Sequence, residues 1–165
     1  MANECYNCDA YDEEREGCTM PSCDRTYACP MEKAGNLQFF LPMIPPTVTA
    51  QEHKVTVRNG RPRFYDPPEL KEARAKLTAH LAQHKPEKPY TRGVRLITRW
   101  CFPVEGHADG EWRTTKPDTD NLQKLLKDCM TAVGFWKDDA LVASELCEKF
   151  WAQVPGIFIK IEVLE

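Results

Sequence analysis

The chain has 165 residues, enough for one ordinary domain and a short appendage. Hydrophobic residues make up 42% of it, which is sufficient for a core, yet no run approaches the roughly 20 apolar residues that a membrane helix needs. The first residues lack a basic region followed by an apolar run. We therefore expect a cytoplasmic protein with no secretory signal and no membrane partner.

The formal net charge of −3 is unevenly distributed along the chain. Residues 1–34 hold 3 basic and 8 acidic side chains, whereas residues 52–100 hold 12 basic and 5 acidic ones. Phosphate binding needs local positive charge rather than a high overall pI, so the basic stretch is compatible with a nucleic-acid partner. A solvated surface of mixed sign accounts for the same distribution equally well.

The N-terminal segment, residues 1–34, contains five of the eight cysteines and is too small to form a core by itself. Its Cys5-x2-Cys8 spacing is typical of zinc chelation by thiolates, and zinc would supply folding free energy. A reducing compartment argues against disulfides, and a disordered Cys-rich tail is the competing interpretation. The predicted zinc ligands are Cys5, Cys8, Cys18 and Cys29, with Cys23 as an alternative.

The main domain is predicted to occupy residues 35–165 and to open with a strand over residues 38–42. A turn at residues 45–47, Pro-Pro-Thr, closes this strand. Short strands are expected over residues 54–58 and 63–65, within a polar and basic stretch.

A first helix is predicted over residues 67–84. Asp66 as the cap, a proline in the first turn and Glu69 near the positive end of the dipole favour a helix start here. A strand over residues 94–102 and a loop over residues 103–117 follow. One face of the helix is expected to carry Leu70, Ala73, Leu77 and Leu81.

A second amphipathic helix follows the loop, because apolar residues from Leu122 to Val133 recur at intervals of three and one. Gly134 ends it. Strands over residues 141–153 and 157–164, with Pro-Gly between them, predict a closing hairpin. The pattern indicates an α+β fold, a mixed β-sheet with two main helices packed on it, plus the small Cys-rich N-terminal element.

Acidic residues gather at the start of this second helix. Asp118 and Asp120 are two apart in an extended approach, where alternate residues point the same way, and Lys124 follows one helical turn later. Asp138 and Asp139 come after the helix, and we expect the segment behind Gly134 to return so that its acid joins the first pair.

Converging carboxylates repel one another unless a cation lies among them, and Mg²⁺ is the cation that prefers carboxylate oxygens together with waters and phosphate. Such a site polarises a phosphodiester and activates a water for in-line attack, while Lys124 would stabilise the growing negative charge. The alternative is that Asp120 caps the helix and the other three aspartates lie on loops.

The run Asp118-x-Asp120-Asn121-x-x-Lys124, followed after the helix by residues 134–139 (Gly-Phe-Trp-Lys-Asp-Asp), resembles the RusA family of Holliday-junction resolvases, often encoded by prophages. The similarity extends over most of the main domain, including the Pro-Pro-Thr turn and the closing hairpin. It implies that Asp118, Asp120 and Asp139 bind Mg²⁺, with Mn²⁺ as a substitute, and that Lys124 is essential.

The same resemblance implies a homodimer that binds a four-way junction of branched DNA and resolves it by paired phosphodiester hydrolysis, inside a bacterial or phage-infected cell. One departure concerns DNA contacts: a run of arginines before the first aspartate is typical of the family, whereas this chain has Glu-Trp-Arg-Thr-Thr-Lys at residues 111–116. Candidate DNA-binding residues are therefore Lys54, Arg58, Arg61, Arg63, Arg92, Arg95 and Lys116.

Two other functions fit parts of the sequence. A non-catalytic branched-DNA-binding protein would bind junctions without metal-dependent cleavage. A zinc-containing protein-interaction module would show no salt-sensitive affinity for DNA. The endonuclease interpretation is favoured because both motif aspartates, the lysine and the distal acid are all present.

Overall fold

A computed structural model of the chain describes residues 35–48 and 67–164, together with the backbone of four short strands outside these ranges. The chain divides into two compact units, Met1–Lys33 and Ala34–Glu165. The predicted zinc ligands lie outside the residues whose side chains are described, so the zinc site stays a prediction; they are Cys5, Cys8, Cys18, Cys23 and Cys29.

The four short strands form two antiparallel pairs. In the first unit, β1 (Tyr11–Asp12) pairs with β2 (Gly17–Cys18). In the second unit, β4 (Lys54–Arg58) pairs with β5 (Arg61–Tyr65) along their whole length. The two short strands expected in the basic stretch are therefore present, and β5 begins two residues earlier than predicted.

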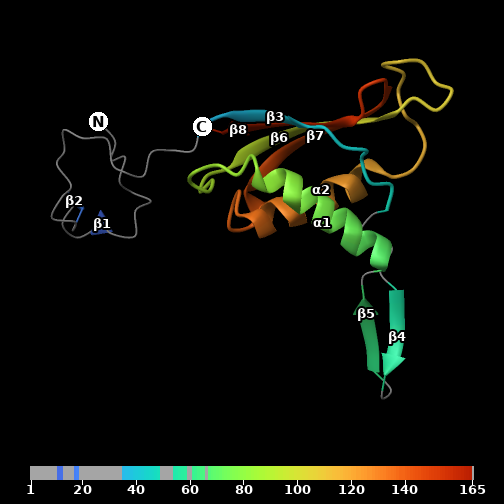
Figure 1. Cartoon of the computed structure of the whole chain (residues 1–165). Helices are drawn as coiled ribbons and strands as arrows, with labels where there is room; N and C mark the ends of the chain where they lie inside the picture. The colour runs from blue at the N-terminus through green and yellow to red at the C-terminus, as the bar shows by residue number, and fades with distance from the viewer. Residues whose placement is uncertain are drawn as a thin grey trace. The chain divides into compact units, whose positions relative to one another are not determined.

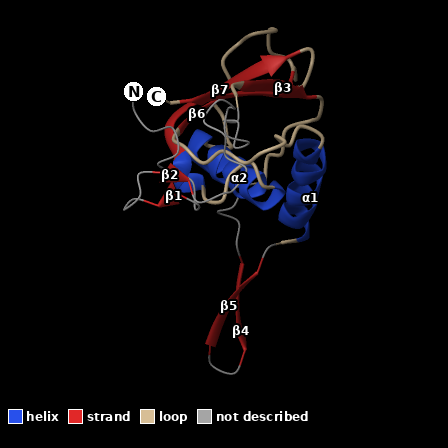
Figure 2. Ribbon diagram, turned by 90° about the vertical axis from the view of Figure 1, so that its left-hand side faces the viewer, coloured by secondary structure: helices blue, strands red, loops and turns tan. Residues whose placement is uncertain are grey.

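The main unit is built on a four-stranded mixed sheet in the order β3-β8-β6-β7. The strands are β3 (Leu37–Leu41), β6 (Val94–Pro103), β7 (Val142–Ala152) and β8 (Gly156–Val163). β6 is parallel to β7, whereas β8 is antiparallel to both β6 and β3. Both helices lie on one face of this sheet (Figure 1 and Figure 2). The predicted α+β class, with a mixed sheet and two helices, is confirmed.

The closing hairpin was predicted wrongly, because β6 lies between β7 and β8 and pairs with each. The connection of residues 153–155 spans two strand spacings of about 4.8 Å each, which three extended residues can do. The period-two pattern identifies a strand but not its neighbour. Gly156 belongs to β8, and a Cβ there would lie 2.0 Å from Phe40 Cζ, so glycine permits this close approach.

The two helices are α1 (Pro68–Ala82) and α2 (Thr119–Val133). The N-cap of α1 is Pro67, which forms no side-chain cap hydrogen bond, so α1 begins one residue later than predicted and ends two residues earlier. The expected cap, Asp66, lies outside the described residues. α2 ends as predicted at Gly134, whose φ of 94° is left-handed. Neither helix is long and apolar enough to cross a membrane, nor is any other within the described residues.

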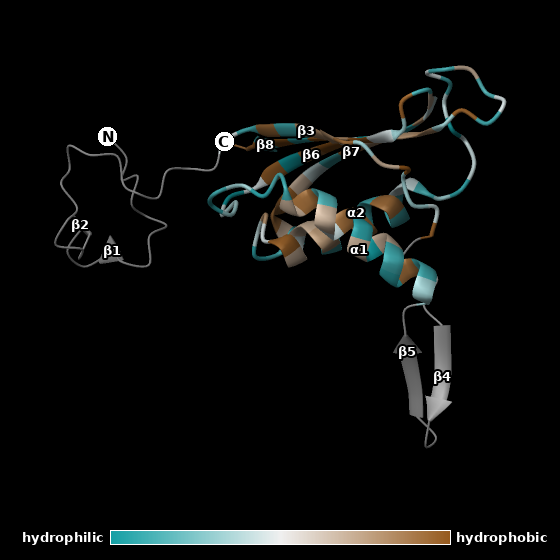
Figure 3. Cartoon of the chain, viewed as in Figure 1, coloured by the Kyte–Doolittle hydropathy of each residue, from teal (hydrophilic) through white to brown (hydrophobic). Residues whose placement is uncertain are grey.

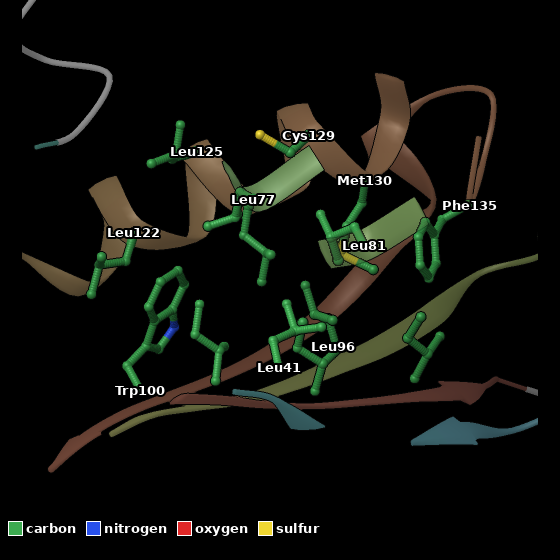
Figure 4. Close-up of a cluster of buried hydrophobic side chains, with 14 of the residues drawn as sticks. Leu41, Leu77, Leu81, Leu96, Trp100, Leu122, Leu125, Cys129, Met130 and Phe135 are labelled. Carbon is green, nitrogen blue, oxygen red and sulfur yellow. The ribbon is translucent and has the colours of Figure 1, made fainter. Parts of the chain in front are cut away.

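The core lies between the two helices and the sheet. Alternate residues of β6 are buried, and Trp100 is fully enclosed on the side that faces the helices. Figure 3 shows how apolar positions recur along both helices and the strands, as the amphipathic patterns predict. In Figure 4 side chains of α1, of α2 and of the turn after α2 meet those of the sheet, namely Leu41, Leu77, Leu81, Leu96, Trp100, Leu122, Leu125, Cys129, Met130 and Phe135.

Candidate functional site

Two exposed carboxylates stand at the N-terminal end of α2. Asp118 is the N-cap residue with extended backbone (φ −75°, ψ 150°), and Asp120 belongs to the first turn. The Asp118 side chain forms no cap hydrogen bond. The interpretation that Asp120 caps the helix is wrong, because Asp120 lies inside α2. Both carboxylates are therefore accessible to a ligand.

Lys124 lies one helical turn beyond Asp120 and is also exposed. The same helix end presents backbone N–H groups with no partner inside the helix, and the helix dipole adds positive potential there. This end of α2 therefore combines two anionic oxygen ligands with a cationic side chain and an anion-favouring helix terminus. The combination can hold a divalent cation and a phosphate together.

The strand β7 lies beside α2, and two of its helix-facing side chains contact the backbone at the start of α2. The Cys147 thiol lies 3.8 Å from the Thr119 carbonyl oxygen, and Lys149 Nζ donates to the Pro117 carbonyl oxygen at 2.6 Å. Burial raises the pKa of the Cys147 thiol, so at neutral pH it is protonated rather than a thiolate ligand. The side chains available to a cation at this end of α2 are thus carboxylates, which suit Mg²⁺ or Mn²⁺ better than zinc.

The second acidic pair lies beyond the other end of α2. Asp138 caps the 3₁₀ turn η2 (Asp139–Leu141), and its Oδ1 accepts a hydrogen bond from the Ala140 N–H at 2.8 Å. Asp139 is half-buried and, with Asp128 and Thr131, lines a shallow surface depression. Since the carboxylate of Asp138 is already engaged as a cap, Asp139 is the better candidate ligand of the two.

Within one chain, Asp139 lies beside the second half of α2, where it lines the same depression as Asp128 and Thr131. Asp128 comes eight residues after Asp120, which corresponds to about 12 Å along the helix axis. Among the described residues, no group of three His, Cys, Asp or Glu side chains could hold a metal ion. The structure therefore brings together Asp118, Asp120 and Lys124, but the expected return of Asp139 to this group does not occur within a single chain.

The candidate DNA-binding residues lie on two parts of the main unit. Four occupy β4 and β5, where the register pairs Arg58 with Arg61 and Thr56 with Arg63, so that their positions fall on one face of the two-stranded ribbon. Arg92 and Lys116 are exposed. Arg95 is exposed on β6, donates to Ser144 Oγ at 3.2 Å and forms an ion pair with Glu162 at 3.8 Å.

Sequence reasoning missed two cations that contact the backbone just before Asp118. They are Arg113, in the loop after β6, and Lys149, in β7. Lys149 occupies a helix-facing position between Cys147 and Trp151, and a lysine at an inward position of a strand is a signal that something polar lies opposite it.

Comparison with known proteins, like the aspartate and lysine motif, points to an endodeoxyribonuclease family. The chain is similar to a protein named crossover junction endodeoxyribonuclease rusA from Lactococcus phage r1t, with 29% identity over 97 residues that cover 57% of this chain and 72% of the phage protein. It is also similar to the uncharacterized protein YqaN of Bacillus subtilis (strain 168), with 26% identity over 118 residues, 64% of this chain and 82% of that protein.

A family model described as endodeoxyribonuclease RusA matches residues 44–162, which is most of the chain and includes every candidate catalytic residue. The matched region runs from the segment after β3 to the end of β8. The chain therefore belongs to the RusA family of endodeoxyribonucleases.

Proposed function

We propose that this protein is a divalent-metal-dependent endonuclease that resolves Holliday junctions, four-way branched DNA, by paired phosphodiester hydrolysis. The observation that carries the proposal is the exposed pair Asp118 and Asp120 at the N-terminal end of α2, with Lys124 one turn away, in a chain of the RusA family. The name of the phage relative supports the choice of substrate.

Asp118 and Asp120 would hold the cation, Mg²⁺ with Mn²⁺ as a substitute. They fit this role because both carboxylates are exposed and Asp118 is not engaged as a cap. Mg²⁺ is commonly held by one or two carboxylates together with waters and a substrate phosphate. When bound, the cation supplies Lewis-acid polarisation of the phosphodiester and lowers the pKa of a water that attacks phosphorus in line.

Lys124 and the N-terminal end of α2 would bind and stabilise the scissile phosphate. A lysine ammonium near the phosphate offsets the negative charge that grows on its oxygens and on the leaving oxygen. The unpaired backbone N–H groups at the start of α2 orient toward the same anion. The backbone N–H groups are part of the helix and need no rearrangement to face a bound phosphate.

We further propose that Asp139 of a second copy supplies a third carboxylate to this cation, since the protein's own Asp139 lies beside the second half of α2. A homodimer is also what the reaction requires, because two symmetric cuts across a junction need two sites related by a two-fold axis. We therefore include a homodimer in the proposal, with each cation held by residues from both copies.

DNA contacts outside the cleavage site would come from the basic positions of the β4–β5 ribbon and from Arg92, Arg95 and Lys116. Basic side chains that bind phosphates release counterions, so affinity should fall steeply with salt. The Cys-rich unit Met1–Lys33 would be a separate domain that binds one structural zinc through Cys5, Cys8, Cys18 and Cys29, or with Cys23 as one of the four.

The test is cleavage of a synthetic four-way junction by the full chain in Mg²⁺. Asp120→Asn should bind the junction in Ca²⁺ like the parent but nick it at least about 100-fold more slowly in Mg²⁺, because even the partners of metal ligands contribute 10- to 100-fold. Glu69→Gln is a matched control, since Glu69 is the second residue of the equally long helix α1 as Asp120 is of α2.

Glu69→Gln should cleave like the parent. Undiminished nicking by Asp120→Asn would remove Asp120 from the metal site. A parent protein that binds the junction and never cuts it in Mg²⁺ or Mn²⁺ would instead favour the non-catalytic DNA-binding function, and absence of salt-sensitive DNA affinity would favour the protein-interaction module.

A further inference from the structure

Three consecutive backbone carbonyls immediately before Asp118 each accept a hydrogen bond from a cationic side chain. Lys149 Nζ donates to the Thr115 oxygen at 2.9 Å and to the Pro117 oxygen at 2.6 Å. Arg113 Nη2 donates to the Lys116 oxygen, between them, at 2.7 Å. Hydrogen bonds from charged donors are among the strong ones in proteins, so this stretch of loop is held at every carbonyl.

The Arg113 guanidinium is itself held by two aromatic rings. Its Cζ lies 4.0 Å from the centroid of Phe102 and 4.4 Å from that of Trp151, two residues that are neighbours across β6 and β7. His107 stacks on Trp151 with centroids 4.3 Å apart. The loop between β6 and α2 is therefore anchored on the sheet through these rings.

Lys149 connects the same loop to β7 by both backbone and side chain. Its carbonyl oxygen accepts a hydrogen bond from the Arg113 N–H at 3.0 Å, while its ammonium reaches the carbonyls of Thr115 and Pro117. Because β7 pairs along its length with β6, the backbone of Lys149 is held by the sheet, and its ammonium ties the loop to that strand.

We propose that Arg113 and Lys149 are positioning residues that fix the backbone ahead of Asp118 and so set the geometry of the Asp118–Asp120 cation site. The proposal rests on the proposed function of that pair. Neither side chain is required to touch DNA or metal: they act by holding the three carbonyls. Sequence reasoning looked for arginines in this segment as DNA contacts, whereas Arg113 is directed to protein carbonyl and aromatic rings.

Removing the Lys149 charge can alter cation binding in two opposite directions. If Lys149 acts only as a nearby positive charge, its loss removes repulsion and the site should bind a divalent cation more tightly. If it positions the carboxylates, its loss releases two carbonyls, Asp118 moves more freely and the site should bind the cation more weakly. The direction of the change therefore distinguishes the two roles.

The experiment compares Lys149→Met and Lys149→Arg in the full-length protein, with Lys160→Met as the matched control. Lys160 is also a strand lysine, but its hydrogen-bonding partner is Glu162, on the face of the sheet without helices. Three quantities are measured: Mn²⁺ binding without DNA, followed by the EPR signal of free Mn²⁺; junction affinity in Ca²⁺; and the Mg²⁺ concentration for half-maximal cleavage. Thermal unfolding confirms that each variant is folded.

We expect Lys149→Met to weaken Mn²⁺ binding about tenfold or more and to raise the half-maximal Mg²⁺ concentration by the same factor, with junction affinity unchanged. Lys149→Arg, which keeps a donor cation, should recover part of the loss, and Lys160→Met should match the parent. Tighter or unchanged Mn²⁺ binding by Lys149→Met would overturn the proposal, as would a loss confined to junction affinity.

The positioning role of Lys149 and the proposed function are contradicted by different results. A parent protein that cleaves, together with a Lys149→Met variant of unchanged cation binding, contradicts the positioning role alone. A parent protein that binds no Mn²⁺ and never cleaves contradicts the proposed function, and the positioning role with it.

Discussion

The two ends of α2 differ in how the chain holds them. At the N-terminal end, a loop bonded to β7 and to aromatic rings leads into two exposed carboxylates. At the C-terminal end, a left-handed glycine, Gly134, leads directly into Trp136, which is buried and donates from Nε1 to Thr131 Oγ1 at 2.8 Å. The first end is held mainly by hydrogen bonds and cation–π contacts of charged side chains, and the second mainly by burial of aromatic side chains.

This difference matters because the acids thought to share one cation are divided between the two ends. A helix is rigid, so the proposed function assigns the third carboxylate to a second copy of the chain. The proposed homodimer would thus link catalysis to assembly, because the helix that carries Asp120 also separates it from Asp139 of the same copy.

The largest expected effect is on cleavage by mixed dimers, which test whether Asp139 acts in the site of the partner copy. A dimer of one Asp120→Asn chain and one Asp139→Asn chain, isolated with two different tags, contains one intact site if Asp139 acts across the interface. It should nick one strand at about half the rate of the parent dimer, whereas each variant alone is inactive. The measurement is nicking of a junction labelled on one strand.

The control for this experiment is a mixed dimer of Asp118→Asn and Asp120→Asn, in which both sites are damaged in either arrangement. It should be inactive. If the Asp120→Asn and Asp139→Asn mixture is equally inactive, Asp139 does not complete a site in the partner, and the two ends of α2 act independently.

A smaller effect, on stability, is expected from a substitution at the C-terminal end of α2. Gly134→Ala should lower the free energy of unfolding by about 1–2 kcal/mol, because an L residue at a φ of 94° is strained. The added Cβ would lie 3.2 Å from Lys85 Nζ, a flexible tip that can move, so the backbone conformation and not a clash causes the loss. Urea denaturation measures the change.

Gly35→Ala is the matched control, since a Cβ there meets nothing within 4 Å and its φ is not in the left-handed range. It should change stability by less than about 0.5 kcal/mol. An equal loss in both variants would mean that Gly134 has no special role in ending α2.

The contrast between the two ends also explains which features could be read from the sequence. The second helix and Gly134 were predictable because an amphipathic repeat and a glycine stop are local signals. The positions of Asp118, Asp120 and Lys124 at the start of this helix were also predictable, because their spacing is local, whereas their role as a metal site stays a prediction. The order of β6, β7 and β8 in the sheet could not be predicted in this way. The alternation of apolar residues identifies each strand, but it does not show which strand lies beside it.

The separation of Asp139 from the acid pair was missed for a related reason. A glycine after a helix predicts that the chain reverses direction, but it does not show where along the returning segment a given residue lies. Asp139 comes only six residues after the end of α2, before the chain has returned to the start of the helix. Arg113 and Lys149 were missed because their partners are backbone carbonyls, which leave no mark in a sequence.

The smallest effect concerns the loop that leads to the N-terminal end. Glu111 accepts hydrogen bonds from the Ala108 N–H and from His107, and these lower the pKa of its carboxyl from 4.5, the backbone bond most. A lowered pKa stabilises the folded loop at pH values above 4.5 and loses that contribution as the pH falls through the lower, folded value. Glu111→Gln should therefore have a slightly lower Tm than the parent at pH 7, and the difference should shrink toward pH 3. Glu87→Gln, which removes an exposed carboxylate outside this loop, is the control. A difference that stays constant from pH 7 to pH 3 would show that the loss does not come from the Glu111 charge, and would contradict a role of this ionised carboxylate in holding the loop that leads to Asp118.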